Sequence, residues 1–166
     1  MASSVLNRDG LLALVRETLR SGTLAGLAMI PFAALFRASG LRINEYGRKT
    51  LELVVGDVAP PLHYALTFAQ HLLISWFAAV PLLWLLGRIE DRRRRPLVGA
   101  LYGVAFYVVV NSWALPLFFG DPTPWELGVE TVYPSLVIHL VYGVVLGLAA
   151  RAPGWLSNRA VVGLAQ

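Results

Sequence analysis

The feature that most constrains this chain is a set of four long segments without a single acidic or basic residue. They cover residues 21–36, 60–87, 96–120 and 131–150. A helix needs about 20 apolar residues to cross the ~30 Å hydrocarbon core of a bilayer. Barrel strands would alternate polar and apolar side chains, and these segments do not. Because only helices and closed barrels satisfy their backbone in lipid, the segments predict membrane-spanning helices.

The composition supports lipid as the surrounding medium. Apolar residues make up 57% of the 166 residues and charged residues 14%, well below the ~25% of soluble domains. The chain has no cysteine, which excludes disulfides, thiolate metal sites and cysteine nucleophiles. It carries no hydrolase or phosphate-binding motif and no carboxylate inside a predicted span. We therefore expect no enzymatic activity and no resident cofactor.

These observations predict an all-α polytopic membrane protein, a four-helix transmembrane bundle with both termini cytoplasmic. The transmembrane domain is expected over residues 21–150, with spans at about 21–37, 65–87, 97–119 and 131–150. Residues 1–20 are expected to form a cytoplasmic amphipathic segment, with a surface helix over 4–20. Residues 151–166 are expected to form a cytoplasmic tail.

The orientation follows from the distribution of arginine and lysine. Ten basic residues fall in the two tails and the loop after the second span, against four in the loops on the opposite side. This asymmetry predicts a bacterial inner-membrane protein with both tails inside. The four consecutive arginines of that loop are interpreted as topology anchors, with the lipid bilayer as the partner and no nucleic acid; they are Arg92, Arg93, Arg94 and Arg95.

The loops on the opposite side contain two helix signals. Residues 38–63 are too long for a tight turn, and 50–58 could form a short amphipathic helix that Pro60 and Pro61 terminate. The third loop contains Thr-Pro-Trp-Glu over 123–126, which is typical of a capping box with proline at the first helical position. A helical turn there would place Trp125 at the membrane interface, with Glu126 completing the box.

Glycine pairs four residues apart occur in three of the spans. Such pairs share one helix face and let two helices approach closely. They predict tight packing inside one bundle, and a homo-oligomer or a larger membrane complex is the alternative. The pairs are Gly22 with Gly26, Gly99 with Gly103, and Gly143 with Gly147.

Uncharged polar residues recur along one face of the second, third and fourth spans and reach similar depths, so they could converge. The candidates for this polar core are His71, Ser75, Tyr107, Asn111, Ser135, His139 and Tyr142. Ionisable residues inside a membrane are functional candidates by default. Histidine could relay protons, because it titrates near neutral pH. The alternatives are hydrogen bonding that only packs the helices, metal binding together with His63, and axial ligation of haem.

The second half of the chain resembles the YagU-type bacterial inner-membrane proteins, a family of unknown function. The resemblance rests on Gln70–Ser75, Gly99-Ala100, Asn111-Ser112-x-x-Leu115-Pro116-Leu117-x-x-Gly120, Pro122, Pro124-Trp125 and His139–Gly143. It implies an integral protein of several helices and no established reaction. It also selects His71, Asn111, Trp125 and His139 as the first positions to test.

Together these predictions describe a small inner-membrane protein that handles protons or a small solute through its polar core. A structural or accessory membrane subunit without an activity of its own is the first alternative. A haem- or metal-binding membrane protein is the second.

Overall fold

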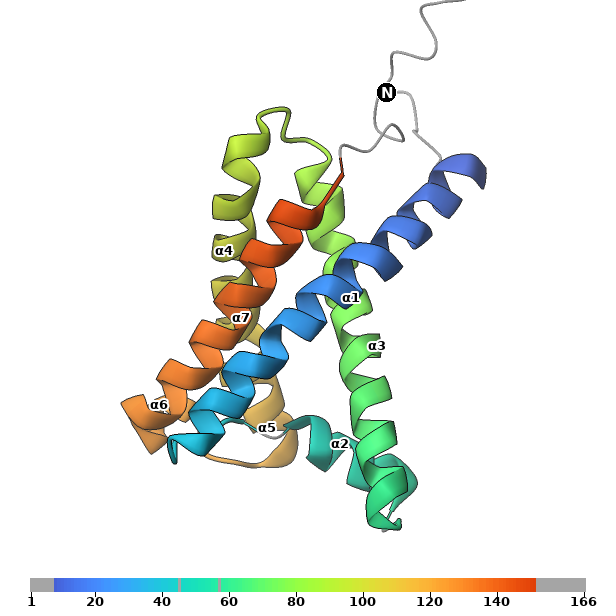
Figure 1. Cartoon of the computed structure of the whole chain (residues 1–166). Helices are drawn as coiled ribbons and strands as arrows, with labels where there is room; N and C mark the ends of the chain where they lie inside the picture. The colour runs from blue at the N-terminus through green and yellow to red at the C-terminus, as the bar shows by residue number, and fades with distance from the viewer. Residues whose placement is uncertain (1–7, 45, 57, 152–166) are drawn as a thin grey trace, which may run out of the picture.

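The computed structural model is all-α and describes residues 8–44, 46–56 and 58–151 (Figure 1). Four helical stretches are long and apolar enough to cross a membrane. Three are single helices, α1 (Arg8–Ala38), α3 (Pro60–Leu86) and α7 (Val129–Ala149). The fourth extends over Arg92–Phe119. The predicted fold class, a bundle of four candidate membrane spans, is thereby confirmed.

The third span consists of four consecutive helical segments of three types, 3₁₀, α and π. It runs through η1 (Arg92–Arg94), α4 (Arg95–Phe106), the π-helix η2 (Tyr107–Ala114) and α5 (Leu115–Phe119). The π-helix ends where the Leu115 amide donates to the carbonyl of Val110, five residues back. Pro116 follows at once and has no amide hydrogen to donate. The span therefore has a π-helical segment on the N-terminal side of this proline.

Two short helices lie at the end of the bundle opposite the start of α1 and the end of α7 (Figure 1). The helix expected over 50–58 is α2 (Tyr46–Val55), which begins earlier and ends before Gly56 at φ 74°. The predicted capping box is present at α6 (Pro124–Leu127). There the Glu126 carboxylate accepts from the Thr123 amide at 2.7 Å, and the Glu126 amide donates to the Thr123 hydroxyl at 3.4 Å.

The predicted boundary between a surface helix and the first span is wrong, because α1 passes through residue 20 without a break. Two of the charges that suggested a boundary, Glu17 and Arg20, are paired with each other. Arg20 pairs with Glu17 at 2.6 Å and donates to the carbonyl of Ala149, the last residue of α7, also at 2.6 Å. The first residues of the predicted segment, 1–7, and the predicted tail from residue 152 lie outside the described residues.

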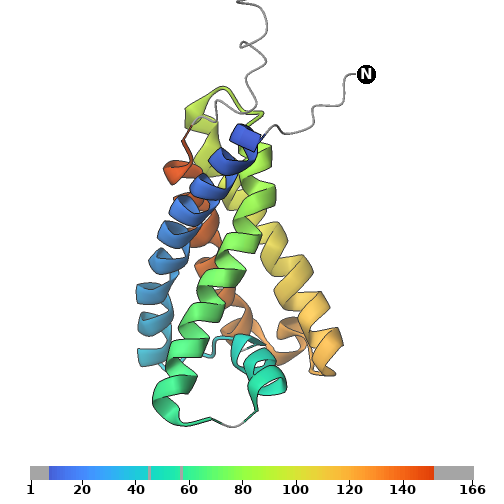
Figure 2. The same cartoon turned by 90° about the vertical axis from the view of Figure 1, so that its right-hand side faces the viewer.

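The helices diverge from one end of the bundle to the other (Figures 1 and 2). α3 and α4 lie close together where residues 87–91 connect them, and we call this end, which also holds Ala150, the narrow end. At the opposite, wide end, α2 lies between α3 and α5. The apolar core lies toward the narrow end. Its buried members are Ala25, Ala78, Ala79, Leu82, Leu83, Leu86, Tyr142, Leu146 and Ala150.

Candidate functional site

The position of the site depends on a contact between the backbones of α4 and α7. A methyl group added to Gly99 would overlap the carbonyl of Gly143, and one added to Gly143 would overlap the carbonyl of Gly99. Gly103 faces the carbonyl of His139 in the same way, and Gly147 faces that of Arg95. Both glycine pairs are therefore used within the chain, and their contact fixes α7 against α4 at the depth of His139.

The remaining glycine pair, Gly22 and Gly26, packs α1 against α3. A methyl group on Gly26 would lie 2.6 Å from the Ser75 hydroxyl, a side chain rather than backbone. The close approach brings the His71 ring to the Gly26 carbonyl, where Nε2 and the oxygen are 2.9 Å apart. Because a carbonyl can only accept, His71 donates from Nε2. His71 is thus held by α1.

A hydrogen-bonded chain runs from the segment before α2 to the middle of α7. The Asn44 amide group donates to Asn111 Oδ1 at 3.0 Å, and Asn111 Nδ2 lies 3.2 Å from His139 Nε2. His139 Nδ1 lies 2.6 Å from the carbonyl of Ser135. The Asn44 backbone amide also donates to the Ser135 hydroxyl at 3.3 Å. We call these four residues the polar chain.

The partners of His139 determine its protonation pattern. Its Nδ1 must carry a hydrogen, because the Ser135 carbonyl can only accept. Its Nε2 then accepts from the Asn111 carboxamide nitrogen, which is the pattern of a neutral imidazole. All three side-chain bonds therefore point the same way, from Asn44 through Asn111 and His139 to the Ser135 carbonyl.

The predicted polar core divides into two sets. Asn111, Ser135 and His139 meet in the polar chain. Ser75 and Tyr142 form a separate contact outside the polar chain. The Tyr142 hydroxyl donates to the Ser75 backbone carbonyl at 2.5 Å and so links α7 to α3. Sequence reasoning missed Asn44, because its neighbours are charged and indicated an exposed loop.

Two fully buried hydroxyls of the π-helix lie beside the polar chain. Tyr107 and Ser112 are each 0% exposed. Their hydroxyls interact with each other, but neither makes a hydrogen bond of normal geometry within the described part of the chain. The Tyr107 ring packs against His139 at 5.6 Å and edge-on against Trp125 at 6.3 Å between ring centroids. Trp125, which lies on α6 at the wide end, is 51% exposed and contacts the π-helix through the Tyr107 ring. These hydroxyls supply unused hydrogen-bonding capacity next to His139.

The predicted arginine anchors differ in their environments. Arg92, Arg93 and Arg94 are exposed, whereas Arg95 is only 4% exposed. Arg95 donates to the carbonyls of Ile89, at 3.0 and 3.2 Å, and of Ala150, at 3.3 Å. A cation at the C-terminus of α7 complements the negative end of the helix dipole. Arg95 therefore stabilises the narrow end in addition to any role as an anchor.

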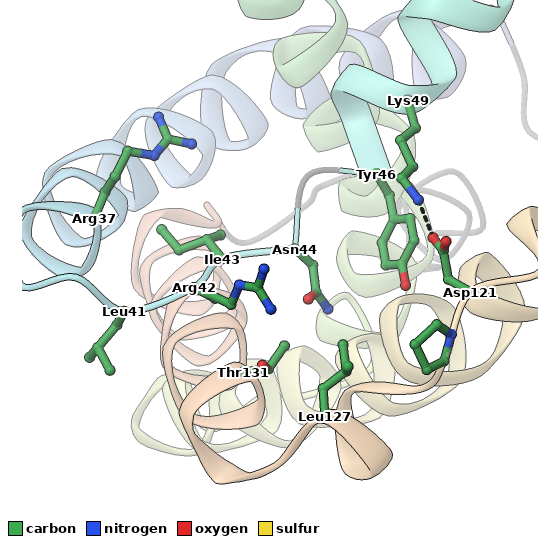
Figure 3. Close-up of a pocket in the computed structure, with 11 residues that line it drawn as sticks. Arg37, Leu41, Arg42, Ile43, Asn44, Tyr46, Lys49, Asp121, Leu127 and Thr131 are labelled. Atoms are coloured by element: carbon green, nitrogen blue, oxygen red, sulfur yellow. Dashed lines mark hydrogen bonds and ion pairs between the residues drawn. The ribbon is translucent and has the colours of Figure 1, made fainter.

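The wide end carries charges outside the candidate spans. Lys49 of α2 forms an ion pair with Asp121 (Figure 3). The Tyr46 ring stacks on Phe119 with 5.6 Å between the ring centroids. Burial, and then the negative charge of Asp121, raise the pKa of the Tyr46 hydroxyl. Hydrogen bonds from Thr123 lower the pKa of Glu126. These contacts attach α2 to the start of the loop that leads into α7.

The metal and haem alternatives gain no support from the arrangement of donors. Among the described residues, no three histidine, aspartate or glutamate side chains are grouped as metal ligands would be. Both ring nitrogens of His139 and one of His71 are already engaged in hydrogen bonds. Axial ligation by these histidines would require breaking the polar chain or the contact with α1.

Fold and site together define a multi-pass membrane protein with a partly buried polar chain. The sequence matches no protein-family model, and neither curated proteins nor solved structures show a significant similarity to it. The resemblance to YagU-type proteins stays a prediction from the residues quoted for it.

Proposed function

We propose that the protein is an integral protein of a bacterial inner membrane that handles protons, or a small polar solute, through the polar core around His139. The observation that carries this proposal is the unidirectional polar chain from Asn44 to the Ser135 carbonyl. Hydrogen bonding for packing alone needs only pairs of residues. Here a loop and two helical segments, η2 and α7, supply consecutive members of one polar chain that leads from the wide end to mid-bundle.

A proton on His139 would reverse two of the three bonds of the polar chain, those from Asn111 to His139 and from Asn44 to Asn111. Both ring nitrogens would then donate, so Asn111 would have to offer its carboxamide oxygen to Nε2. Its NH2 group would then face Asn44, which would also have to turn its carboxamide. Protonation at mid-bundle is thus coupled to the segment at the wide end. The buried hydroxyls of Tyr107 and Ser112 can hydrogen-bond the water or solute that delivers the proton.

The orientation belongs to the same proposal. In the structure α1 begins and α7 ends at the same end of the bundle (Figure 1). The basic residues concentrated at this end favour the cytoplasm for it. The wide end, with Asn44 and Trp125, would then face outward. In this orientation the polar chain serves the entry of a proton or a small polar solute from outside. The protein then acts without chemical conversion of a substrate.

The test is proton flux into liposomes that contain the purified protein and an internal pH-sensitive dye, driven by a potassium diffusion potential. His139→Gln should reduce the flux at least about tenfold, since a positioned proton-transfer group contributes that much or more. Asn111→Leu should do the same by interrupting the chain. His63→Gln is the matched control, because His63 lies outside the polar chain, and it should leave the flux unchanged.

Two results would contradict the proposal. If the wild-type protein passes no more protons than empty liposomes, or if His139→Gln retains full flux, proton handling is wrong. A loss of thermal stability without a change in flux would instead favour the structural or accessory role. Thermal unfolding of each variant in detergent distinguishes a variant that has lost its fold from one in which only the polar chain is interrupted.

A further inference from the structure

A cavity of about 500 Å³ opens at the wide end, next to the start of the polar chain (Figure 3). We call it the wide-end pocket. Its walls come from the segment between α1 and α2, from α2, and from the region around α6 and the first turn of α7. Asn44 belongs to both the pocket wall and the polar chain. A solute in this pocket would therefore contact the first member of the chain.

Cations outnumber anions among the described residues that line the pocket. The lining contains three cations, Arg37, Arg42 and Lys49, and a single carboxylate, Asp121, with which Lys49 is already paired. The Arg42 guanidinium lies beside Asn44 in the middle of the view of the pocket in Figure 3. Within the part of the chain that the structure describes, no hydrogen bond or ion pair engages it. Its charge and its five N–H donors are directed at the pocket without a described counter-ion.

A second donor lines the same cavity. Thr131, on the first turn of α7, is 4% exposed. Its hydroxyl forms no hydrogen bond with the described residues. A planar guanidinium binds carboxylate and phosphate groups with two parallel hydrogen bonds. A hydroxyl nearby can satisfy a further oxygen of the same group.

We propose that the wide-end pocket binds a small oxyanion, a carboxylate or phosphate group, with Arg42 as the principal ligand and Thr131 as a second donor. This proposal deepens the proposed function and rests on it for the role of the pocket as the entrance to the polar chain. The phosphate group could come from a free solute or from a lipid headgroup. Binding can be measured without transport, so the two proposals can fail separately.

The experiment uses the full chain in nanodiscs of zwitterionic phosphatidylcholine, titrated by calorimetry with inorganic phosphate and, separately, with acetate. The wild-type protein should bind at least one of these probes. Arg42→Gln should weaken binding at least about tenfold, as expected when a charge-assisted bidentate contact is lost. Arg48→Gln is the matched control, because Arg48 lies six residues further on and outside the pocket. It should change the affinity less than twofold.

A second arm separates the two sources. The protein is purified from membranes containing phosphatidylglycerol, and the lipid that remains bound is measured by mass spectrometry. Retention of phosphatidylglycerol by the wild type and its loss in Arg42→Gln would assign the site to a headgroup. Absence of binding in both arms, or binding that Arg42→Gln leaves intact, would overturn the proposal.

The His139→Gln protein connects the two tests. It should bind phosphate or acetate as the wild type does, since His139 does not line the pocket. If binding fails in the wild type while His139→Gln still reduces proton flux, only the oxyanion site is wrong. If the wild type binds phosphate or acetate but shows no proton flux, the proposed function is wrong and the oxyanion site in the wide-end pocket still stands.

Discussion

The narrow and wide halves of this bundle are held together by different kinds of contact. In the narrow half, α4 and α7 touch through backbone atoms at four glycines, above a core of leucine and alanine. In the wide half, a chain of carboxamides and an imidazole joins the helices and a loop. Backbone contacts cannot adjust to a change in size, whereas hydrogen-bonded side chains can turn. The difference indicates a rigid half that positions the site and an adjustable half that contains it.

The largest expected effect comes from breaking the rigid half. Gly143→Leu would force a side chain into the Gly99 carbonyl, so α4 and α7 would have to separate. We expect a loss of at least about 3 kcal/mol in unfolding free energy, or failure to fold, because overpacking without a yielding neighbour costs the most. Unfolding in detergent followed by circular dichroism measures it.

The control for this prediction is Gly47→Ala in α2. The nearest atom to the added methyl group is 3.5 Å away, at the end of the Gln70 side chain. An alanine there should leave the stability unchanged or raise it by about 0.5–1 kcal/mol. Equal losses of unfolding free energy in Gly143→Leu and Gly47→Ala would mean that the backbone contact between Gly143 and Gly99 contributes no more to stability than an open position on α2.

An intermediate effect is expected where a glycine faces a side chain. Gly26→Ala should cost roughly 1–2 kcal/mol, because its methyl group would lie 2.6 Å from the Ser75 hydroxyl oxygen and 3.1 Å from the Ser75 Cβ. The double variant with Ser75→Ala should recover part of that loss. A double-mutant cycle measures the coupling, which should exceed about 0.5 kcal/mol. Strict additivity would show that α1 and α3 do not meet here.

A smaller loss should follow from removing one interhelical hydrogen bond. Tyr142→Phe deletes the donor to the Ser75 carbonyl and leaves the ring in place. Such bonds contribute about 0.6 kcal/mol on average in membrane proteins. Tyr64→Phe, at a ring that is 74% exposed, is the matched control and should have no measurable effect. A loss above 2 kcal/mol would mean that α3 depends on this bond more than on its apolar contacts.

The smallest effect concerns the loop at the wide end. The pKa of Glu126 is lowered by the Thr123 hydrogen bonds, so its carboxylate is favoured in the folded loop. The stabilisation is present above the unfolded pKa, near 4.5, and is lost as the pH falls through the lowered folded value. The protection factors for hydrogen exchange over 123–128, which compare the observed rate with the intrinsic rate at each pH, should therefore fall at low pH. In Glu126→Ala they should be low already at neutral pH, and unchanged protection would contradict the capping role.

The narrow half was easier to predict than the wide half. Charge-free segments predicted the spans, and the glycine spacing predicted close approach, because both depend on local composition. The capping box at Thr123 was predictable for the same reason. The continuity of α1 was not, because the pairing of Arg20 with Glu17 and Ala149 depends on the tertiary arrangement.

The site itself depends on contacts that sequence spacing does not reveal. Asn111 and His139 were expected at one depth and are hydrogen-bonded, whereas His71 was expected with them and is held by α1. Asn44 lies in the loop between α1 and α2. The path of this loop depends on the position of α2 and on the contact of Asn44 with Ser135 of α7. The π-helix has no signal in the sequence other than Pro116 after it.

The length of α1 has a mechanical consequence for the bilayer. Its 31 residues extend about 46 Å, roughly half as long again as the hydrocarbon layer. Its axis is oblique to that of α3 (Figure 1). A tilted helix responds to a change in bilayer thickness by changing its tilt. Since α1 holds the end of α7 through Arg20 and the His71 ring through Gly26, thinning or thickening of the membrane would act on both halves of the protein at once.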